Sequence, residues 1–192
     1  NKLNITFGFR GNISSKIAFN AKLNYSNIGD QYFYVNDTSS ITPLQNKFDV
    51  VYDDMKRMRI LAEMSYKTGE HLFVTLKANY FQYDLDKQAQ PWHLPQYTVS
   101  LNTRYIIQKK IVLDANVFAI GDRPVREFDV SGNEYQKTLQ SVIDLNIGVE
   151  YHLSKVFSAF AYFNNLSSVK YQKWNNYPTQ RFNFMLGLAY SF

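Results

Sequence analysis

Arg181-Phe182-Asn183-Phe184-Met185-Leu186-Gly187-Leu188-Ala189-Tyr190-Ser191-Phe192 is the last stretch of the chain, and its pattern is the strongest indication of the architecture. Apolar residues occupy every even position from Phe182 to Phe192. Successive side chains of a β-strand point to opposite faces, so a period of two predicts a strand with one apolar face. A helix of this sequence would be apolar on all sides and would show no stripe.

The same alternation recurs through the chain and predicts an all-β fold of about nine strands without a helix. One segment, 156–165, is ambiguous because aromatic residues lie on both of its faces. The predicted strands cover residues 3–9, 17–25, 58–67, 72–80, 97–107, 113–119, 143–153, 156–165 and 182–192.

The connections between these strands alternate in length. Tight turns are predicted at residues 12–15, 68–70, 109–110 and 154–155. Long polar connections are predicted at residues 27–55, 86–96, 121–140 and 167–180. An antiparallel transmembrane β-barrel has short periplasmic turns and longer outside loops, whereas a soluble sandwich has no reason for this asymmetry.

The first long connection keeps the alternation of its flanking strands. Phe33 and Val35 continue the odd positions, and Phe48, Val50 and Tyr52 continue the even ones. Both flanking strands are therefore predicted to extend past the membrane and to turn near residues 38–45.

Composition bounds the remaining classes. The 192 residues are 45% hydrophobic, which excludes a disordered chain, and no apolar run approaches the roughly 18 residues of a transmembrane helix. Cysteine is absent, which excludes disulfides, thiol nucleophiles and thiolate metal sites. The net charge of +5 is modest, and the densest basic cluster is Lys56-Arg57-Met58-Arg59, so no nucleic-acid partner is expected. No cofactor is predicted.

Periodicity alone does not say whether the apolar face meets lipid or a second sheet, but three features favour lipid over a soluble β-sandwich. The strands have about the 10 residues that a tilted strand needs to cross the hydrocarbon. Tyr25, Tyr66 and Tyr151 are among the aromatics that mark the ends of apolar faces, as in an interfacial girdle. The polar faces carry charges of both signs that can pair across a wet lumen. The predicted lumen-facing residues are Lys22, Arg59, Glu63, Lys77, Arg104, Asp114, Asp144 and Glu150.

The strand count leaves two arrangements open. A single-chain bacterial barrel has an even number of strands and both termini in the periplasm. Nine strands ending in the periplasm begin outside, so residues 1–192 are interpreted as the C-terminal part of a larger barrel. The alternative closes residues 16–192 into a complete eight-stranded barrel with a structural or adhesive role, against which stands the clean alternation from Leu3 to Phe9. The first residues show no secretory signal.

Motifs near the C-terminus carry a family resemblance. Phe163-Asn164-Asn165-Leu166-Ser167-Ser168-Val169-Lys170-Tyr171 is followed by Trp174, by Tyr177-Pro178 and by the final strand. This order resembles the end of TonB-dependent outer-membrane receptors, in which an Asn-Leu-Phe-Asx-Lys-Lys-Tyr-like stretch, a Tyr-Pro loop and a Gly-Arg step precede a last strand ending in Phe. Ser167 stands at the position of the usual aromatic, and Gln180 at that of the Gly.

The resemblance implies a bacterial outer-membrane localisation and a barrel of about 22 strands around an N-terminal plug domain. Uptake of a nutrient or metal chelate would be driven by a TonB-type energiser acting through that plug, which is not within residues 1–192. The lumen face would contact the plug, and the outer face would contact lipid and lipopolysaccharide. Tyr190 and Phe192 would form the C-terminal signal for the barrel-assembly machinery. The transported small molecule is not readable from the sequence.

Six loop residues are candidates for ligand contact, because aromatic faces stack on sugars or planar chelates and Arg pairs with acidic groups. The competing and favoured interpretation makes the aromatics girdle anchors and the arginines partners of lipopolysaccharide phosphates. The six residues are Trp92, Arg123, Arg126, Tyr171, Trp174 and Tyr177.

Catalysis is not expected. His71, His93 and His152 lack metal-ligand spacing. His93 lies in a long loop with Asp84 and Asp86 nearby in sequence, as a barrel enzyme would need, but solvated polar residues explain the same pattern. A barrel enzyme is therefore the third hypothesis, after the receptor and the small complete barrel.

Overall fold

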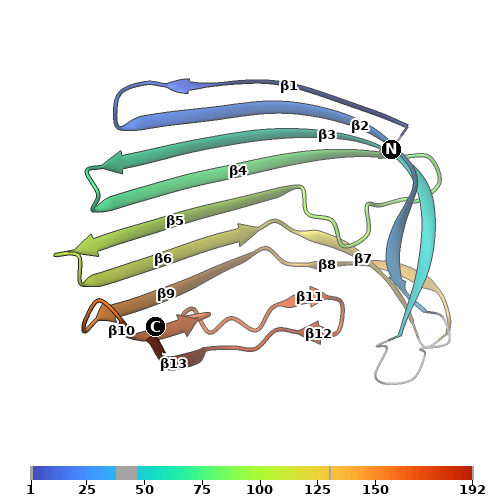
Figure 1. Cartoon of the computed structure of the whole chain (residues 1–192). Coiled ribbons are helices and arrows are strands. Elements are labelled where there is room, and N and C mark those ends of the chain that lie inside the picture. Colours follow the sequence, from blue (N-terminus) through green and yellow to red (C-terminus); the bar gives the residue numbers. More distant parts are fainter. Residues whose placement is uncertain (1, 38–46, 130, 192) are drawn as a thin grey trace.

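The computed structural model describes residues 2–37, 47–129 and 131–191, and most of them form one antiparallel sheet (Figure 1). The described part of the chain contains no helix long and apolar enough to cross a membrane. In spatial order, the sheet consists of β1 (Leu3–Asn12), β2 (Ile17–Asn36), β3 (Phe48–Thr68), β4 (Leu72–Leu85), β5 (Tyr97–Ile107), β6 (Ile111–Ile120), β9 (Val142–His152), β10 (Phe157–Asn164) and β13 (Asn183–Tyr190).

Tight turns join the strands at one end of the sheet and long connections at the other (Figure 1). Two long connections contain hairpins that the alternation did not predict. β7 (Arg123–Phe128) pairs with β8 (Glu134–Leu139), and β11 (Gln172–Trp174) pairs with β12 (Tyr177–Pro178). The ambiguous segment 156–165 contains β10, which pairs with β9 and β13. The predicted all-β antiparallel architecture and the one-sided placement of the loops are confirmed.

No second layer covers the apolar face of the sheet in the described part of the chain. Leu186 is 65% exposed, Phe182 46% and Leu101 37%. A soluble sandwich would bury these side chains between two sheets about 10 Å apart, so the sandwich alternative is wrong. An apolar face that no protein layer covers is suited to contact with acyl chains.

The sheet does not close on itself. Among the described strands, β1 pairs only with β2, and β13 pairs only with β10. The eight-stranded alternative needs β2 to pair with β13, but β2 pairs with β1 from Leu3↔Asn27 to Asn12↔Ala18. Residues 3–9 therefore belong to a genuine strand, and the eight-stranded closure does not form.

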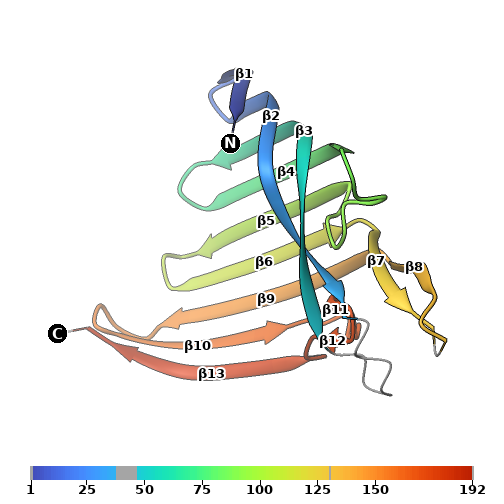
Figure 2. The same ribbon diagram turned by 90° about the vertical axis from the view of Figure 1, so that its right-hand side faces the viewer.

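β2 and β3 form a ribbon of 20 and 21 residues, about twice the length that a strand needs to cross a bilayer. Their pairing runs from Ile17↔Tyr66 to Asn36↔Phe48, so the predicted continuation of both strands into the first long connection is confirmed. The predicted turn near residues 38–45 lies outside the described residues. The far part of the ribbon sweeps across the loop ends of the other strands (Figure 2).

A bulge corrects one detail of the predicted alternation. The register of β2 shifts between Ile28 and Gln31, and Asp30 there adopts a left-handed conformation with φ 51°. An inserted residue moves all later side chains to the opposite face. Phe33 and Val35, predicted to continue the outer face, are consequently buried, at 2% exposure each.

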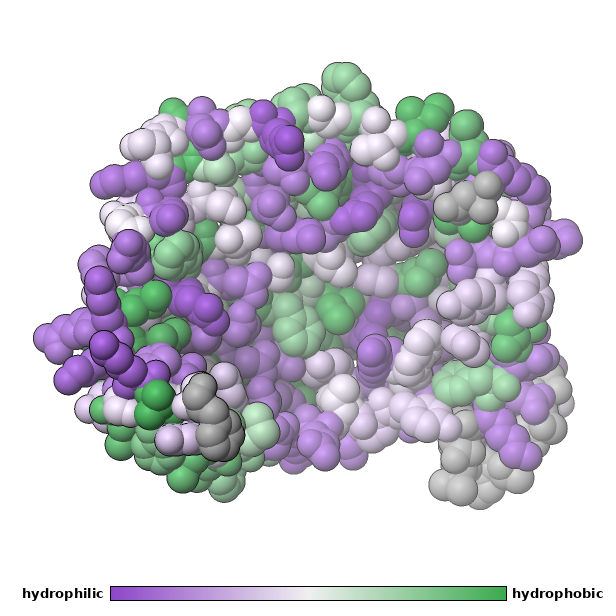
Figure 3. Space-filling model, in the orientation of Figure 1, coloured by the Kyte–Doolittle hydropathy of each residue, from purple (hydrophilic) through white to green (hydrophobic). Residues whose placement is uncertain are grey.

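The inner face is polar and hollowed. The face turned to the viewer in Figure 3 is concave and mainly hydrophilic. Arg104 donates two hydrogen bonds to Asp114, at 2.8 and 3.0 Å, and Arg59 donates two to Asn79 Oδ1, at 3.0 and 2.8 Å. These hydrogen bonds join neighbouring strands on the inner face, opposite the apolar residues.

Two glycines on the inner face make room for aromatic rings of the neighbouring strand. A Cβ at Gly148 would lie 2.6 Å from the Tyr162 ring, and a Cβ at Gly187 would lie 2.3 Å from the Phe160 ring. Each ring therefore covers backbone that a larger residue would push away, which is the usual way in which aromatics protect glycine in a sheet.

We expect Leu101→Arg to destabilise the protein by about 2–4 kcal/mol, because it places a charge on the lipid face near the middle of β5. The matched control is Asn102→Arg at the adjacent inner-face position, for which a loss of about 0.5 kcal/mol or less is expected. Urea unfolding of the full-length protein in lipid vesicles measures both. Equal losses at the two positions would contradict the assignment of the faces.

We expect Gly148→Ala to cost about 1–3 kcal/mol, because the added methyl group displaces the Tyr162 ring. The same substitution in a Tyr162→Ala background should cost much less, since the obstructing ring is then absent. The same unfolding measurement gives the coupling between the two positions, and strictly additive losses would show that the ring does not occupy this space.

Candidate ligand-binding rim

Four segments far apart in the sequence meet at the loop end of the sheet: the far part of the β2–β3 ribbon, loop 86–96, and the β7–β8 and β11–β12 hairpins (Figure 2). Part of this rim is a small apolar core of Phe33, Val35, Met55 and Trp92, each at most 4% exposed. Trp92 Nε1 donates a hydrogen bond to Gln88 Oε1 at 3.0 Å. Trp92, a candidate for ligand contact, therefore packs loop 86–96 against the ribbon in this structure.

His93 connects three of these segments through backbone groups. Its Nδ1 lies 3.0 Å from Tyr34 O on the ribbon, and its Nε2 accepts a hydrogen bond from Asn175 N at 3.2 Å. Its own backbone N donates to Pro124 O at 2.8 Å. Because Nε2 accepts, the proton of the neutral ring lies on Nδ1 and points at Tyr34 O. Burial lowers the pKa of His93 to about 4, so the ring is neutral at physiological pH.

Asn175 extends this connection to β7. Its side chain is fully buried, and its Nδ2 donates to Asn36 Oδ1 at 2.9 Å and to Glu127 Oε1 at 2.6 Å. Glu127 is 3% exposed and also accepts hydrogen bonds from Tyr135 and Lys137. Burial alone would raise the pKa of Glu127, but the three hydrogen bonds outweigh it and hold that pKa below the usual value.

We call the residues that join the ribbon, loop 86–96 and the two hairpins the rim cluster. Trp174 belongs to it, because its ring centroid lies 5.2 Å from that of Tyr34 and 5.1 Å from that of His93. The rim cluster consists of Tyr34, Phe48, His93, Glu127, Trp174 and Asn175.

The structure brings several of the candidate loop residues together at the rim cluster. Arg123 is 3% exposed, and its Nη1 donates to Lys173 O at 3.1 Å. Trp174 and Tyr177 keep 37% and 46% of their surface exposed, so both are accessible from solvent. Tyr171 OH donates to Asp144 Oδ2 at 3.3 Å.

Arg126 lies apart from this group. It alternates with the buried positions of β7, forms an ion pair with Glu134 at 2.9 Å and has its guanidinium over the Phe128 ring. Ligand contact by any of the six candidate residues stays a prediction.

The predicted lumen residues share the inner face. The strand register aligns Glu63 with Lys77 and Arg104 with Asp114 across neighbouring strands. Asp144 differs from the other predicted lumen residues, because it lies at the rim end of β9 and is only 6% exposed. At the opposite end, Tyr190 pairs with Phe157 and is 60% exposed, while Phe192 lies outside the described residues.

The described ranges bring no residues together as a metal site. No group of three or more His, Cys, Asp or Glu side chains there could hold a metal ion. Asp84 pairs with Lys56 at 3.6 Å rather than with His93, whose two ring nitrogens both face backbone groups. The histidine that the enzyme hypothesis requires is therefore used to join loops.

Sequence reasoning missed the structural part that His93, Glu127 and Asn175 play. His93 was interpreted as a solvated loop residue, yet it is 6% exposed. Its partners lie 59 and 82 residues away in the sequence, and periodicity carries no information on contacts between loops. The continued alternation at Phe33 and Val35 was the one available sign that the ribbon packs against something.

The rim cluster contains buried polar atoms without a partner among the described residues. One is Asn175 Oδ1, which belongs to the cluster, and the other is Nε of the neighbouring Arg123. Such a group costs about 1–3 kcal/mol. These two atoms therefore reduce the stability that the contacts between the loops contribute.

We expect acid to loosen the rim cluster. The pKa of His93 is lower in the folded protein (about 4) than in the unfolded chain (about 6.5), so between these values the unfolded state binds more protons. The contribution of neutral His93 to the free energy of unfolding is complete above about pH 6.5 and is lost as the pH falls toward 4. Protonation would put Nε2–H against Asn175 N–H and a charge near Arg123.

Limited proteolysis of the rim loops between pH 7.5 and pH 4 measures this loosening. The loss is bounded by about 3 kcal/mol, from the difference of the two pKa values. His93→Asn is the control, because Asn tolerates the positive φ of 62° at this position but does not titrate. An unchanged pH profile in that variant would exclude His93 as the titrating group.

No protein-family model and no curated protein matches this sequence. Solved structures match it in fold: the pyoverdine outer-membrane receptor FpvA of Pseudomonas aeruginosa PAO1 (TM-score 0.77, 14% identity), the siderophore receptor PirA of Acinetobacter baumannii (0.78, 15%) and the FrpB iron transporter of Neisseria meningitidis (0.72, 16%). Each match covers 98% of this chain, which spans 29% of the FpvA chain and 31% of each of the other two. The chain therefore has the fold of outer-membrane receptor barrels, and the predicted resemblance to TonB-dependent receptor barrels is confirmed at the level of fold.

Proposed function

We propose that this chain forms part of the wall of a TonB-dependent outer-membrane receptor that imports a metal chelate. The observation that carries the proposal is one continuous sheet, apolar outside and polar inside, in a chain of which 98% matches receptor barrels. Two of the matched proteins are named as pyoverdine or siderophore receptors and one as an iron transporter. A chelated metal ion is therefore the substrate class that the comparisons favour.

The edges of the sheet support a barrel larger than nine strands. An unpaired backbone N–H or C=O in hydrocarbon costs several kcal/mol, so a sheet that spans a membrane has to close. β1 and β13 each have one neighbour among the described strands. Under this proposal, further strands of the receptor pair with both edges in a barrel of about 22 strands.

The inner face supports contact with a plug domain. Lys22, Arg57 and Lys77 form no ion pair within the described residues, and Arg57 Nε is buried without a hydrogen-bond partner. These cations are available to carboxylates of a domain that fills the lumen. A TonB-type energiser would act through that plug, and the outer face would meet lipid and lipopolysaccharide. The barrel-assembly machinery would bind the last strand at Tyr190 and Phe192.

We expect cells that carry the full-length protein to accumulate ⁵⁵Fe from at least one chelate in a panel of hydroxamate, catecholate and pyoverdine-type siderophores. Uptake should fall to background when TonB is deleted or the proton-motive force is collapsed, because the closed lumen needs an energised plug to open. Chelate uptake that persists without TonB would contradict the proposal.

The same assay tests ligand contact at the rim. Trp174→Ala combined with Tyr177→Ala should raise the half-saturating chelate concentration about tenfold or more, as expected for aromatic contact residues. Tyr52→Ala is the matched control, since Tyr52 is an exposed ribbon tyrosine on the lipid-facing parity. Immunoblots of outer-membrane fractions confirm equal receptor levels, and an equal effect of all three substitutions would argue against a specific ligand contact.

A further inference from the structure

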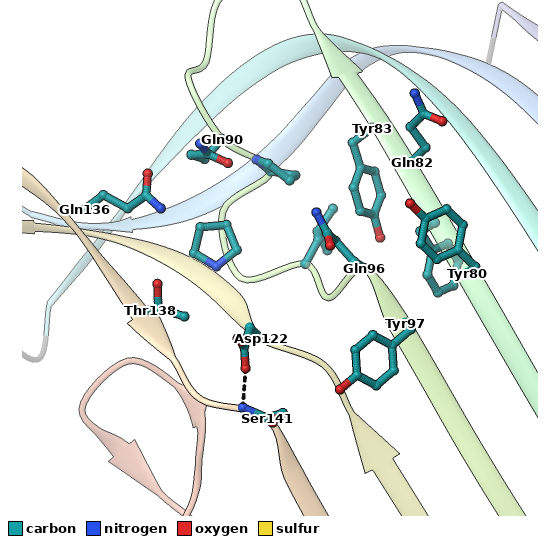
Figure 4. A pocket seen from close by; sticks show the side chains of 14 residues that line it. Tyr80, Gln82, Tyr83, Gln90, Gln96, Tyr97, Asp122, Gln136, Thr138 and Ser141 are labelled. Atoms are coloured by element: carbon teal, nitrogen blue, oxygen red, sulfur yellow. Dashed lines mark hydrogen bonds between the residues drawn. The ribbon is translucent and has the colours of Figure 1, made fainter.

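The extracellular rim has a notch where β5 begins. β4 continues to Leu85, whereas its pairing with β5 ends at Tyr80↔Tyr97. The segment before β5 folds back, held by a hydrogen bond from Tyr83 OH to Pro95 O at 3.0 Å. With the β7–β8 hairpin as its other wall, the notch forms a pocket of about 460 Å³, within the range of about 300–1,000 Å³ for small-molecule sites (Figure 4).

Uncharged polar side chains surround this pocket. Figure 4 shows Gln90, Gln96, Gln136 and Thr138 arranged around the opening. None of these four side chains takes part in a hydrogen bond with another group of the described chain. Each amide offers two donors and an acceptor, and the hydroxyl offers both, so the groups are available to a ligand rich in hydroxyls.

The charges that line the pocket disfavour an anionic ligand. No Lys or Arg lines it, and its one ionisable acid is Asp122, which accepts a hydrogen bond from Ser141 N at 2.5 Å. A phosphate or carboxylate would meet this carboxylate without a compensating cation. The rings of Tyr80, Tyr83 and Tyr97 supply apolar faces against which the carbon skeleton of a ring-shaped ligand can pack.

The height of the pocket along the barrel indicates where its ligand is found. Tyr80 and Tyr97 are 48% and 41% exposed and end the lipid-facing sides of β4 and β5. Aromatics at this position form the girdle at the membrane–water interface. The pocket lies beside them at the outer rim, at the level of lipid headgroups, and Phe81 and Tyr83 line it from the inner-face side of β4.

We propose that this pocket binds an uncharged saccharide. The same chemistry is offered by a sugar of an outer-leaflet glycolipid and by a soluble glycan, and the pocket accepts either. Neither Trp174 nor Tyr177 lines the pocket, so saccharide binding is separate from the proposed chelate contacts, and it anchors the rim to the glycan layer around it.

The test uses the full-length protein in nanodiscs. One arm probes a glycan array of neutral, phosphorylated and carboxylated oligosaccharides, and the other compares the affinity for lipopolysaccharide-containing and phospholipid-only vesicles. Neutral glycans, or lipopolysaccharide stripped of its phosphates, should bind. Binding in the first arm identifies a soluble source, and binding only in the second identifies a glycolipid.

Gln96→Leu combined with Gln136→Leu should weaken that binding about tenfold or more, because two polar partners are lost at nearly constant volume. Gln140→Leu is the matched control, since Gln140 is exposed nearby but does not line the pocket. Chelate uptake should be unchanged in all three substitutions, which separates this site from the transport proposal. No binding in either arm, preference for phosphorylated glycans, or equal affinity in variant and control would overturn the proposal.

Discussion

The apolar outer face of the sheet has no protein layer over it in residues 2–37, 47–129 and 131–191, and the rest of the architecture depends on what covers it instead. Side chains such as Leu186 and Leu188, at 65% and 69% exposure, would be unfavourable in water at about 25 cal/mol for each Å². Lipid removes this cost without a second sheet. The polar groups are then confined to the opposite face, where Arg104 and Asp114 pair across strands.

Outside the membrane, no lipid covers apolar side chains, so they have to be buried by the protein itself. Loops in water need not expose apolar residues to lipid, so they build a core of their own from Phe33, Val35, Met55 and Trp92. The bulge before Gln31 makes this core accessible to the ribbon, because it turns Phe33 and Val35 away from the outer face. A strand that is lipid-facing for half its length thus becomes a packing element for the other half.

The sequence predicted what the backbone period determines, and it missed what distant loops decide. Alternation located the strands of the main sheet, with only the faces of β10 left ambiguous, and it located β1, whose pairing with β2 excludes the eight-stranded closure. The β11–β12 hairpin has only Gln172–Trp174 and Tyr177–Pro178, too short for any period to show. Trp92 and Arg123 were chosen as loop residues free to meet a ligand, yet both are buried, because their partners come from other loops. His93 was interpreted as a solvated residue because its partners also lie on distant segments of the chain.

The distribution of charge differs between the inner face and the notch at the outer rim. The inner face carries Lys22, Arg57 and Lys77 without ion pairs in the described chain, so it favours anionic groups. The notch at the outer rim has no cation and one carboxylate, Asp122, so it disfavours them. A ligand suited to one side is poorly suited to the other. Under the two proposals, a glycan at the notch and an anionic group on the inner face would use different side chains, so the two would not compete for the same contacts.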